Sequence, residues 1–191
     1  MKNLLILFLL FSEIVVAQET RSFNFHFGAS AVKKGFVAVG PGLRYQDNGV
    51  YGFDFNTSPE FFSSGKGNAL KRDGISSKKP FYFSVKLPEG NYKVTVGLGS
   101  QDEQGLTTIK AESRRLMLEN IATGSGKFRE ESFIVNIKDR EIQSGPEAGE
   151  RVGLKERELS KLDWDDKLTL EFDQQTVLYS LTIAPAEDQI T

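Results

Sequence analysis

Apolar and polar side chains alternate along much of this chain, most clearly in two neighbouring runs. Apolar or aromatic residues occupy every second position over 81–87 and again over 92–98. A period of two is that of a strand with one buried face. The intervening Pro-Glu-Gly-Asn at 88–91 favours a tight turn, because proline fixes φ and glycine and asparagine tolerate positive φ. The pattern predicts a β-hairpin over 80–99, whose apolar face further strands must cover.

Similar short runs recur along the chain, separated by turns rich in glycine, asparagine and aspartate. We expect strands within 21–28, 32–39, 50–55, 106–111, 115–121, 131–137, 152–154, 167–172 and 177–183. The run at 115–121 contains good helix formers, but its alternation favours a strand. The polar stretch 62–79 predicts a long surface loop. About ten short strands without a long helix indicate an all-β fold, a two-sheet jelly-roll sandwich.

The first 17 residues have the composition of a secretory signal peptide. Lys2 precedes an apolar run from Leu4 to Phe11, and small residues end the segment at Ala17. The run is too short to span a bilayer, so we expect export to the periplasm or the cell exterior without membrane insertion. Residues 18–191 are of a size that forms a single domain.

Composition excludes several kinds of site. The chain has no cysteine, which rules out disulfides, cysteine-ligated metals and a cysteine nucleophile. Its 24 basic and 26 acidic side chains give a net charge of −2. No basic stripe is interleaved with aromatic residues, so a nucleic-acid partner is not expected.

A catalytic apparatus is not indicated either. His26 is the only histidine, and it alternates with phenylalanines in the first expected strand, which predicts a structural residue on the polar face. A Ser-His-acid triad needs an imidazole beside its nucleophile, and no glycine-flanked serine accompanies His26. A pair of carboxylates could hydrolyse glycosides, but the sequence identifies no such pair among its acidic residues. We therefore expect this chain not to be an enzyme.

Three acidic residues, Asp163, Asp165 and Asp166, surround the single tryptophan, Trp164. Carboxylate oxygens are the ligands that calcium prefers, so a structural calcium ion is one interpretation. The spacing lacks the Asp-x-Asp-x-Asp-Gly loop pattern, and a solvated loop is the favoured alternative. No other cofactor is indicated.

Carbohydrate recognition needs a flat aromatic surface for the apolar face of a sugar, with polar groups around it for the hydroxyls. Tyr45, Tyr51 and Trp164 are candidates for the surface, and Arg114 and Arg115 are candidates for hydrogen-bond donors. Each of these side chains could equally pack in the core or at an interface, because large aromatic residues in sandwiches are mostly buried.

Several separated blocks resemble one family. In order they read FNFHFG, VYGFDF, PFYFSVKLPEGNYKVTVGLG, TTIKAESRRLMLENI, ESFIVNI, VGLKEREL and WDDKLTLEF. Together they resemble the galactose-binding-like β-sandwich that precedes the catalytic domain of secreted rhamnogalacturonan acetylesterases, also described as a β-agarase/YXIM-esterase-like galactose-binding domain. The resemblance covers nearly all of Phe23 to Ala184.

The resemblance implies a jelly-roll accessory module of a pectin-degrading system. In such esterases a Gly-Asp-Ser segment that opens the SGNH-type hydrolase domain should follow residues 188–191, so no catalytic residue can be assigned within this sequence. Two hypotheses remain. The chain is a non-catalytic module that binds plant cell-wall polysaccharide, or it is the N-terminal part of a rhamnogalacturonan acetylesterase whose sandwich packs against an SGNH-type esterase domain.

Overall fold

The computed structural model of this chain describes most of the residues after position 20. The described ranges are 21–28, 34–46, 48–65, 68–142, 145–158 and 162–186. The predicted signal peptide at 1–17 lies outside these ranges. Within the ranges, no helix combines the length and the apolar character that crossing a membrane requires.

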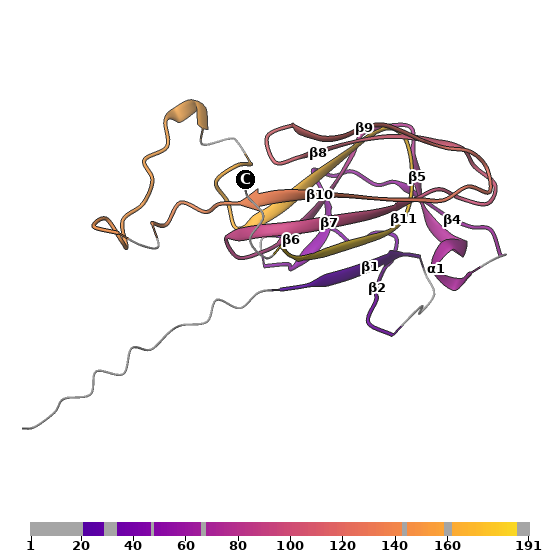
Figure 1. The fold of residues 1–191 in the computed structure, drawn as a ribbon, viewed down its shortest axis with the longest axis horizontal. Coiled ribbons are helices and arrows are strands. Elements are labelled where there is room, and N and C mark those ends of the chain that lie inside the picture. Colours follow the sequence, from indigo (N-terminus) through magenta and orange to yellow (C-terminus); the bar gives the residue numbers. More distant parts are fainter. Residues whose placement is uncertain are drawn as a thin grey trace, which may run out of the picture.

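β-strands form almost all of the regular structure in these ranges (Figure 1). The strands are β1 (Phe23–Phe27), β2 (Val37–Val39), β3 (Tyr51–Asp54), β4 (Glu60–Ser63), β5 (Asp73–Ser77), β6 (Phe81–Lys86), β7 (Gly90–Leu98), β8 (Gly105–Ala111), β9 (Arg115–Thr123), β10 (Arg129–Ile137) and β11 (Lys167–Pro185). Two short helices accompany them, α1 (Ala69–Arg72) and a 3-10 helix (Glu156–Glu158). The all-β prediction is confirmed, including the strand expected at 115–121.

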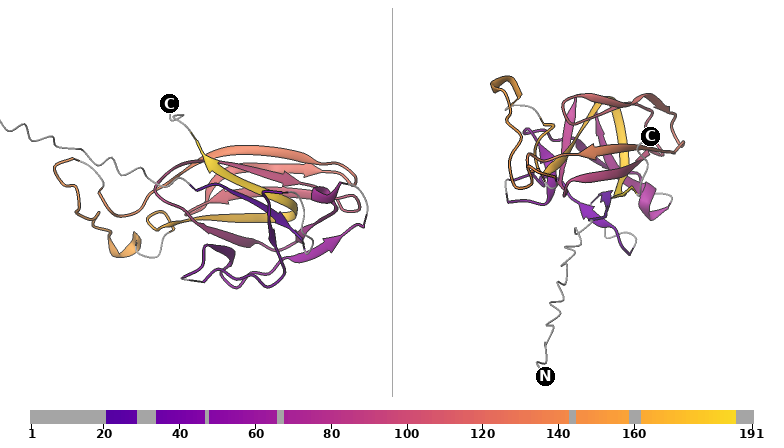
Figure 2. Two further views of the ribbon diagram at one scale, coloured as in Figure 1. Left: turned by 90° about the horizontal axis from the view of Figure 1, so that it is seen from below. Right: turned by 60° about the vertical axis from the view of Figure 1, so that its left-hand side comes forward.

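The strands form two layers that share the long strand β11 (Figure 2). The first layer has the order β10-β7-β11-β1-β2, and β4 joins it through β5, which also pairs with β11. The second layer has the order β3-β6-β11-β8-β9. Residues 167–175 of β11 pair with β6 and β8, whereas residues 176–185 pair with β5, β7 and β1.

The passage of β11 between the layers depends on a local irregularity. Gln174 has a positive φ of 68°, and the pairing of β11 with β7 shifts register between Leu178 and Ser180. An extra residue in one strand bends that strand and increases its twist. The two strands predicted at 167–172 and 177–183 are therefore one bent strand of 19 residues.

Aromatic side chains fill the space between the layers. The ring of Phe83 on β6 lies 5.3 Å from Phe25 and 5.4 Å from Phe27, both on β1 in the first layer. It also lies 5.4 Å from Phe53 on β3. All four rings are buried, and all three contacts of Phe83 have the edge-to-face geometry that aromatic pairs favour.

The predicted hairpin over 80–99 is wrong, although both of its strands exist. β6 pairs with β3 and β11 in the second layer, whereas β7 pairs with β10 and β11 in the first. The connection between them crosses from one layer to the other, and Leu87 within it is buried and donates its N–H to the Asp166 carbonyl at 3.0 Å. Alternation shows that both strands face an apolar core, but it does not show whether they lie side by side or across that core.

The prediction of a long loop over 62–79 is also wrong. This stretch contains the end of β4, helix α1 and β5. Apart from Ile75, β5 consists of aspartate, glycine and serine, so no apolar alternation marks it. Its main chain is held on both sides, by β4 and by β11.

His26 is buried, whereas the sequence placed it on a polar face of β1. Both sides of β1 are covered, and His26 lies close to Asp73 where β5 begins. Burial lowers the pKa of the ring, while the Asp73 charge and backbone groups at Asp73 and Leu70 oppose the shift. The predicted exposure on a polar face is therefore wrong, because β1 is covered on both sides; the structural role stays a prediction.

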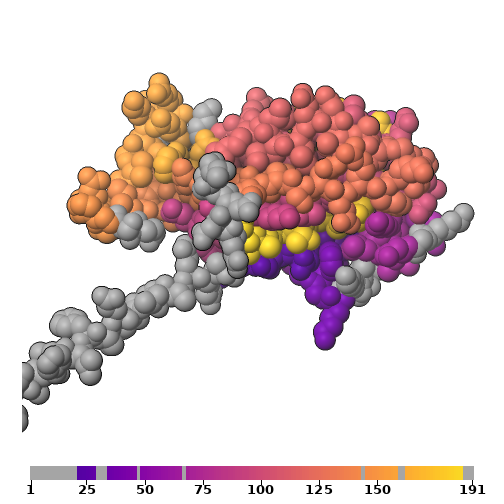
Figure 3. Space-filling model, in the orientation of Figure 1, coloured from indigo at the N-terminus to yellow at the C-terminus, as the bar shows by residue number. Residues whose placement is uncertain are grey.

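The segment 145–158 extends away from one end of the sandwich, as the space-filling view in Figure 3 shows in orange. The strand predicted at 152–154 does not form there. Instead, Glu141 and Arg151 form an isolated antiparallel β-bridge.

Because Phe83 contacts rings from both layers, truncating it should weaken their association. We expect Phe83→Ala to lower the free energy of unfolding by about 3–5 kcal/mol, the range for large-to-small changes at buried phenylalanine. Urea denaturation measures this, with Ile134→Ala as the control because Ile134 is exposed on β10. Equal losses in the two variants would contradict the packing described.

Candidate functional site

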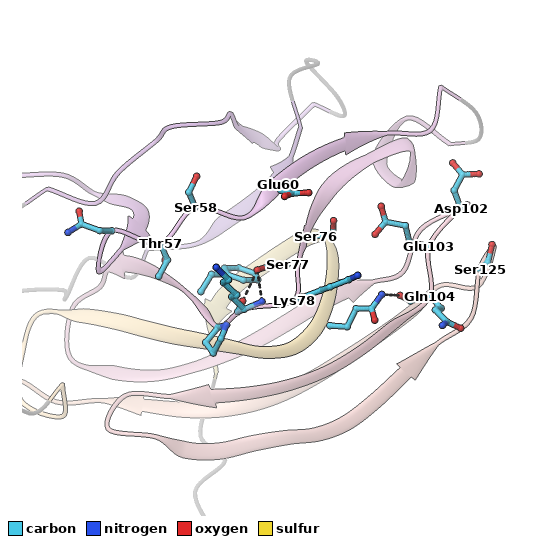
Figure 4. A pocket seen from close by; sticks show the side chains of 15 residues that line it. Thr57, Ser58, Glu60, Ser76, Ser77, Lys78, Asp102, Glu103, Gln104 and Ser125 are labelled. Carbon is cyan, nitrogen blue, oxygen red and sulfur yellow. Dashed lines mark hydrogen bonds between the residues drawn. The ribbon is translucent and has the colours of Figure 1, made fainter.

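Two depressions in the described surface are large enough to hold a small ligand. The larger, here called the end pocket, lies where several strands end and has a volume of about 1170 Å³. It is lined by Asn56, Thr57, Ser58, Glu60, Ser76, Ser77, Lys78, Lys79, Pro80, Phe81, Asp102, Glu103, Gln104, Ser125 and Gln175 (Figure 4).

Most side chains that line the end pocket are polar, and Pro80 and Phe81 are the exceptions. Its labelled side chains in Figure 4 carry hydroxyl, carboxylate, amide and ammonium groups. Its walls are held by local hydrogen bonds, such as that from the Ser77 hydroxyl to the Lys79 carbonyl at 2.7 Å. The one ring in its lining, Phe81, is buried in the core. The end pocket therefore offers no flat apolar surface.

The smaller depression, here called the outer cleft, lies on the outer face of the second layer. Its volume is about 420 Å³, and its lining consists of Phe55, Tyr82, Glu112, Ser113, Arg114, Leu162 and Glu171. Tyr82 and Glu171 are paired residues on β6 and β11, so they lie side by side on the sheet. The other lining residues come from three connections, at 55–58, 112–114 and 162–166.

Phe55 provides an aromatic wall for the outer cleft. Its side chain is 51% exposed, and its ring meets that of Tyr82 edge to face at 5.1 Å. The turn after β3 fixes this position. The Phe55 N–H donates to a carboxylate oxygen of Asp54 at 2.7 Å, and the Tyr82 N–H donates to the Thr57 hydroxyl at 3.0 Å.

The opposite wall is the turn at 112–114. The Glu112 N–H donates to the Thr169 carbonyl at 2.9 Å, and the Thr169 N–H donates to the Glu112 carboxyl at 3.1 Å. The Ser113 N–H donates to Asp163 at 3.2 Å, and the Leu162 N–H donates to the Ser113 hydroxyl at 3.0 Å. The turn is thus fixed to β11 on one side and to the 162–166 connection on the other.

Unfavourable backbone conformations are concentrated in this lining. Phe55, Glu112 and Arg114 have φ values of 51°, 54° and 68°, so three of the seven lining residues adopt the left-handed region without being glycine. Each such residue costs about 1–3 kcal/mol and persists where the surroundings hold it in place. Strain of this kind clusters at functional sites, which favours the outer cleft over the end pocket.

The charges at the floor of the outer cleft are paired. The Lys110 ammonium donates to Glu171 at 2.9 Å and to Asp173 at 3.0 Å, and these carboxylates raise the pKa of Lys110. Beside them, Lys167 donates to Asp54 at 2.8 Å.

Arg114 is different. It is 78% exposed, and its Nε lies 3.9 Å from the Glu171 carboxylate, too far for a hydrogen bond.

The pKa of Glu112 is raised to about 8, chiefly by burial and also by the charges of Asp165 and Asp163, while the Thr169 N–H and Arg115 oppose the shift. At neutral pH Glu112 is therefore largely a neutral carboxylic acid that can donate a hydrogen bond. Burial also raises the pKa of Asp165, to about 6.

The structure places one of the five predicted carbohydrate-binding residues, Arg114, in the outer cleft. Arg115 begins β9 and is exposed, but it does not line the cleft. Trp164 is partly buried in the 162–166 connection and also lies outside the lining.

The two predicted tyrosines pack against other residues. Tyr45 lies under the ammonium of Lys167, which is 4.6 Å from the ring centroid. Tyr51 packs on the aromatic core, with its ring 4.8 Å from Phe25 and 6.1 Å from Phe23.

Sequence reasoning missed Phe55, Tyr82, Glu112 and Glu171. Phe55 ends an alternating run directly before Asn56, where a turn is expected to expose its side chain, so its position was a usable signal. Glu112 had no such signal, because its contacts are with Thr169 on β11, which is distant in the sequence.

The three aspartates considered for calcium have partners within the chain. Asp163 accepts from Ser113, Asp165 accepts from the Lys167 N–H at 3.3 Å, and Asp166 pairs with the Lys86 ammonium at 2.7 Å. Among the residues that the structure describes, no group of three or more histidine or acidic side chains is arranged to hold a metal ion.

The lining of the outer cleft supplies a ring, a cation, a neutral acid and hydroxyl groups, which are the elements of a binding site. Among the described residues, no histidine lines the outer cleft, and His26 is buried in β1. The two strand layers define an all-β sandwich, and the outer cleft gives it a candidate binding site.

The comparison with family models places the chain more narrowly. A model described as β-agarase/YXIM esterase-like, galactose-binding domain-like, matches residues 23–150. The chain therefore belongs to this family, as the sequence resemblance indicated.

Known relatives agree on the fold. The uncharacterized esterase YxiM of Bacillus subtilis (strain 168) is 26% identical over an alignment of 137 residues, and the match covers 68% of this chain and 33% of YxiM. The chain thus spans about a third of the length of the curated relative that it matches. A crystal structure of the B. subtilis YxiM protein superposes with a TM-score of 0.61 at 20% identity, over 88% of this chain and 41% of that one. A β-glucuronidase of Bacteroides uniformis superposes with a TM-score of 0.54 at 7% identity, over 87% of this chain and 18% of that one.

The raised pKa of Glu112 predicts a pH-dependent stability. The folded state holds the proton more tightly than the unfolded chain, so this contribution is fully present below about pH 4.5 and is lost as the pH rises through about 8. Glu112→Gln stays neutral and can still accept from the Thr169 N–H. We expect the variant to gain stability relative to the natural chain as the pH rises, by about 2 kcal/mol or more at alkaline pH.

Urea denaturation across this pH range measures the difference between the two proteins. Glu119→Gln, which changes an exposed glutamate on β9, is the control. If the stabilities of the natural chain and of Glu112→Gln vary with pH in parallel, Glu112 does not hold a buried proton.

Proposed function

We propose that this chain is a non-catalytic carbohydrate-binding module of an exported, pectin-degrading esterase system. The outer cleft would hold a sugar residue of plant cell-wall polysaccharide. The single observation that carries the proposal is the exposed ring of Phe55, held over a cleft that is otherwise lined by hydrogen-bonding groups.

The chemistry of the lining suits a sugar. A pyranose ring has an apolar face of C–H groups that packs on an aromatic ring, and hydroxyls at its edge that need donors and acceptors. Phe55 and Leu162 supply apolar surface, while Glu112, Arg114 and Glu171 supply polar groups around it. The site is also preorganised, because the 55–58 and 112–114 turns are hydrogen-bonded to the strands beside them.

The esterase context supports an accessory role. The family to which the chain belongs is a galactose-binding-like domain, and its curated relative is an esterase of about three times the matched length. In that setting the sandwich would keep the esterase near its polymer by binding the polymer itself.

A second function is supported by the coverage of the relatives. Because the chain spans only part of YxiM, the sandwich could serve chiefly as a packing partner for an SGNH-type hydrolase domain. A stable complex with such a domain in size-exclusion chromatography, together with no polysaccharide binding by the sandwich alone, would favour this role.

Removing the Phe55 ring tests the carbohydrate-binding proposal. We expect Phe55→Ala to weaken binding to pectic or galactan polymers by roughly tenfold or more, since stacking on one ring contributes on the order of 1–3 kcal/mol. Affinity electrophoresis in gels that contain each polymer measures the change.

Leu116→Ala is the matched control, because Leu116 is 53% exposed and lies outside the outer cleft. Urea denaturation of both variants shows whether they remain folded. Binding that survives Phe55→Ala unchanged would remove the outer cleft from the proposal, and no retardation of the natural chain by any polymer would remove the proposal itself.

A further inference from the structure

We propose that the outer cleft selects an acidic sugar, a uronate, whose carboxylate binds to the guanidinium of Arg114. This inference rests on the proposed function and specifies its ligand class. It follows from the exposure of Arg114 and from its weak pairing within the cleft.

Three lining residues of the outer cleft can carry a charge: Glu112, Arg114 and Glu171. The Glu171 carboxylate is buried and already accepts from Lys110 at 2.9 Å. Glu112 is largely protonated at neutral pH, so it adds no charge there. Arg114 is paired only through a long contact, 3.9 Å from its Nε to Glu171, and its charge also acts on Asp173. Because this contact is not a hydrogen bond, an incoming carboxylate can replace it.

The position of Arg114 suits an incoming anion. Its side chain is 78% exposed, and its Nε is 3.9 Å from the nearer Glu171 oxygen, so its donors are available at the mouth of the cleft. A guanidinium presents donors in a planar fork that matches a carboxylate in bidentate geometry. The left-handed backbone at Arg114, with φ 68°, fixes the base of this side chain beside Phe55 and Glu112 in the same lining.

Glu112 makes the selection depend on pH. The charged groups that act on it are Asp165 and Asp163 from the 162–166 connection and Arg115 from β9, and Arg114 and Glu171 share its lining. Below its pKa of about 8, Glu112 donates a hydrogen bond to an acceptor oxygen of the ligand. Above this pH it is an anion that repels the uronate carboxylate.

Two arginines that are adjacent in the sequence provide a matched test. Arg114→Gln removes the guanidinium from the cleft, and Arg115→Gln removes an exposed guanidinium outside it. The ligands are a trisaccharide of galacturonate and the corresponding neutral trisaccharide of galactose, titrated calorimetrically at about pH 6.5, where Glu112 is protonated.

We expect the natural chain and Arg115→Gln to bind the acidic trisaccharide roughly tenfold or more tightly than the neutral one, and Arg114→Gln to lose this preference while it retains the neutral ligand. Equal binding of both ligands by the natural chain, or equal effects of the two substitutions, would overturn the inference but leave the proposed function standing. Binding of neither ligand by the folded natural chain would count against both.

The pH dependence gives a second readout. Between about pH 6.5 and pH 9.5 the uronate stays ionised, so a fall in its affinity reports a group on the protein. We expect the affinity of the natural chain for the acidic trisaccharide to fall roughly threefold or more over this range, and that of Glu112→Gln to stay constant. A fall of equal size in Glu112→Gln would show that Glu112 is not the group involved.

Discussion

The architecture depends on β11, which is the one strand among the described residues that pairs with members of both layers. Its first half lies between β6 and β8, and its second half lies between β7 and β1 with β5 beside it. Inward positions such as Leu168, Leu170 and Phe172 are fully buried in the core. Because side chains alternate along a strand, their burial forces Thr169 and Glu171 onto the outer face of the second layer. The same constraint that holds the sandwich together thus sets part of the floor of the outer cleft.

This outer face is polar and yet largely covered. A continuous series of hydrogen bonds runs from Lys167 through Asp54, Ser84 and Thr169 to Glu112. Buried polar groups that are all satisfied fix a unique arrangement of the segments that carry them. The 55–58 and 112–114 turns rest on this network and are held in backbone conformations that they would otherwise avoid. The proposed ligand would then meet a cleft that needs little rearrangement.

The sequence predicted where strands lie more reliably than it predicted which strands pair with each other. Alternation located β6 and β7 within a residue or two, because burial of one face is a local property. Their assignment to different layers depends on pairing with β11, about 80 residues later, and no local pattern reports it. Strand β5 was missed for the converse reason, since its pairing on both sides stabilises a segment with only one buried apolar side chain. Among the candidate site residues, Arg114 lies in the outer cleft because its turn is hydrogen-bonded to segments that are distant in the sequence. Tyr51, in contrast, packs against the aromatic core.

A structure of the chain with a bound oligosaccharide tests the account most directly. The account predicts density for a sugar ring packed on Phe55, with polar atoms within hydrogen-bonding distance of Arg114 and Glu112. A sugar ordered in the end pocket, with the outer cleft holding only solvent, would contradict it.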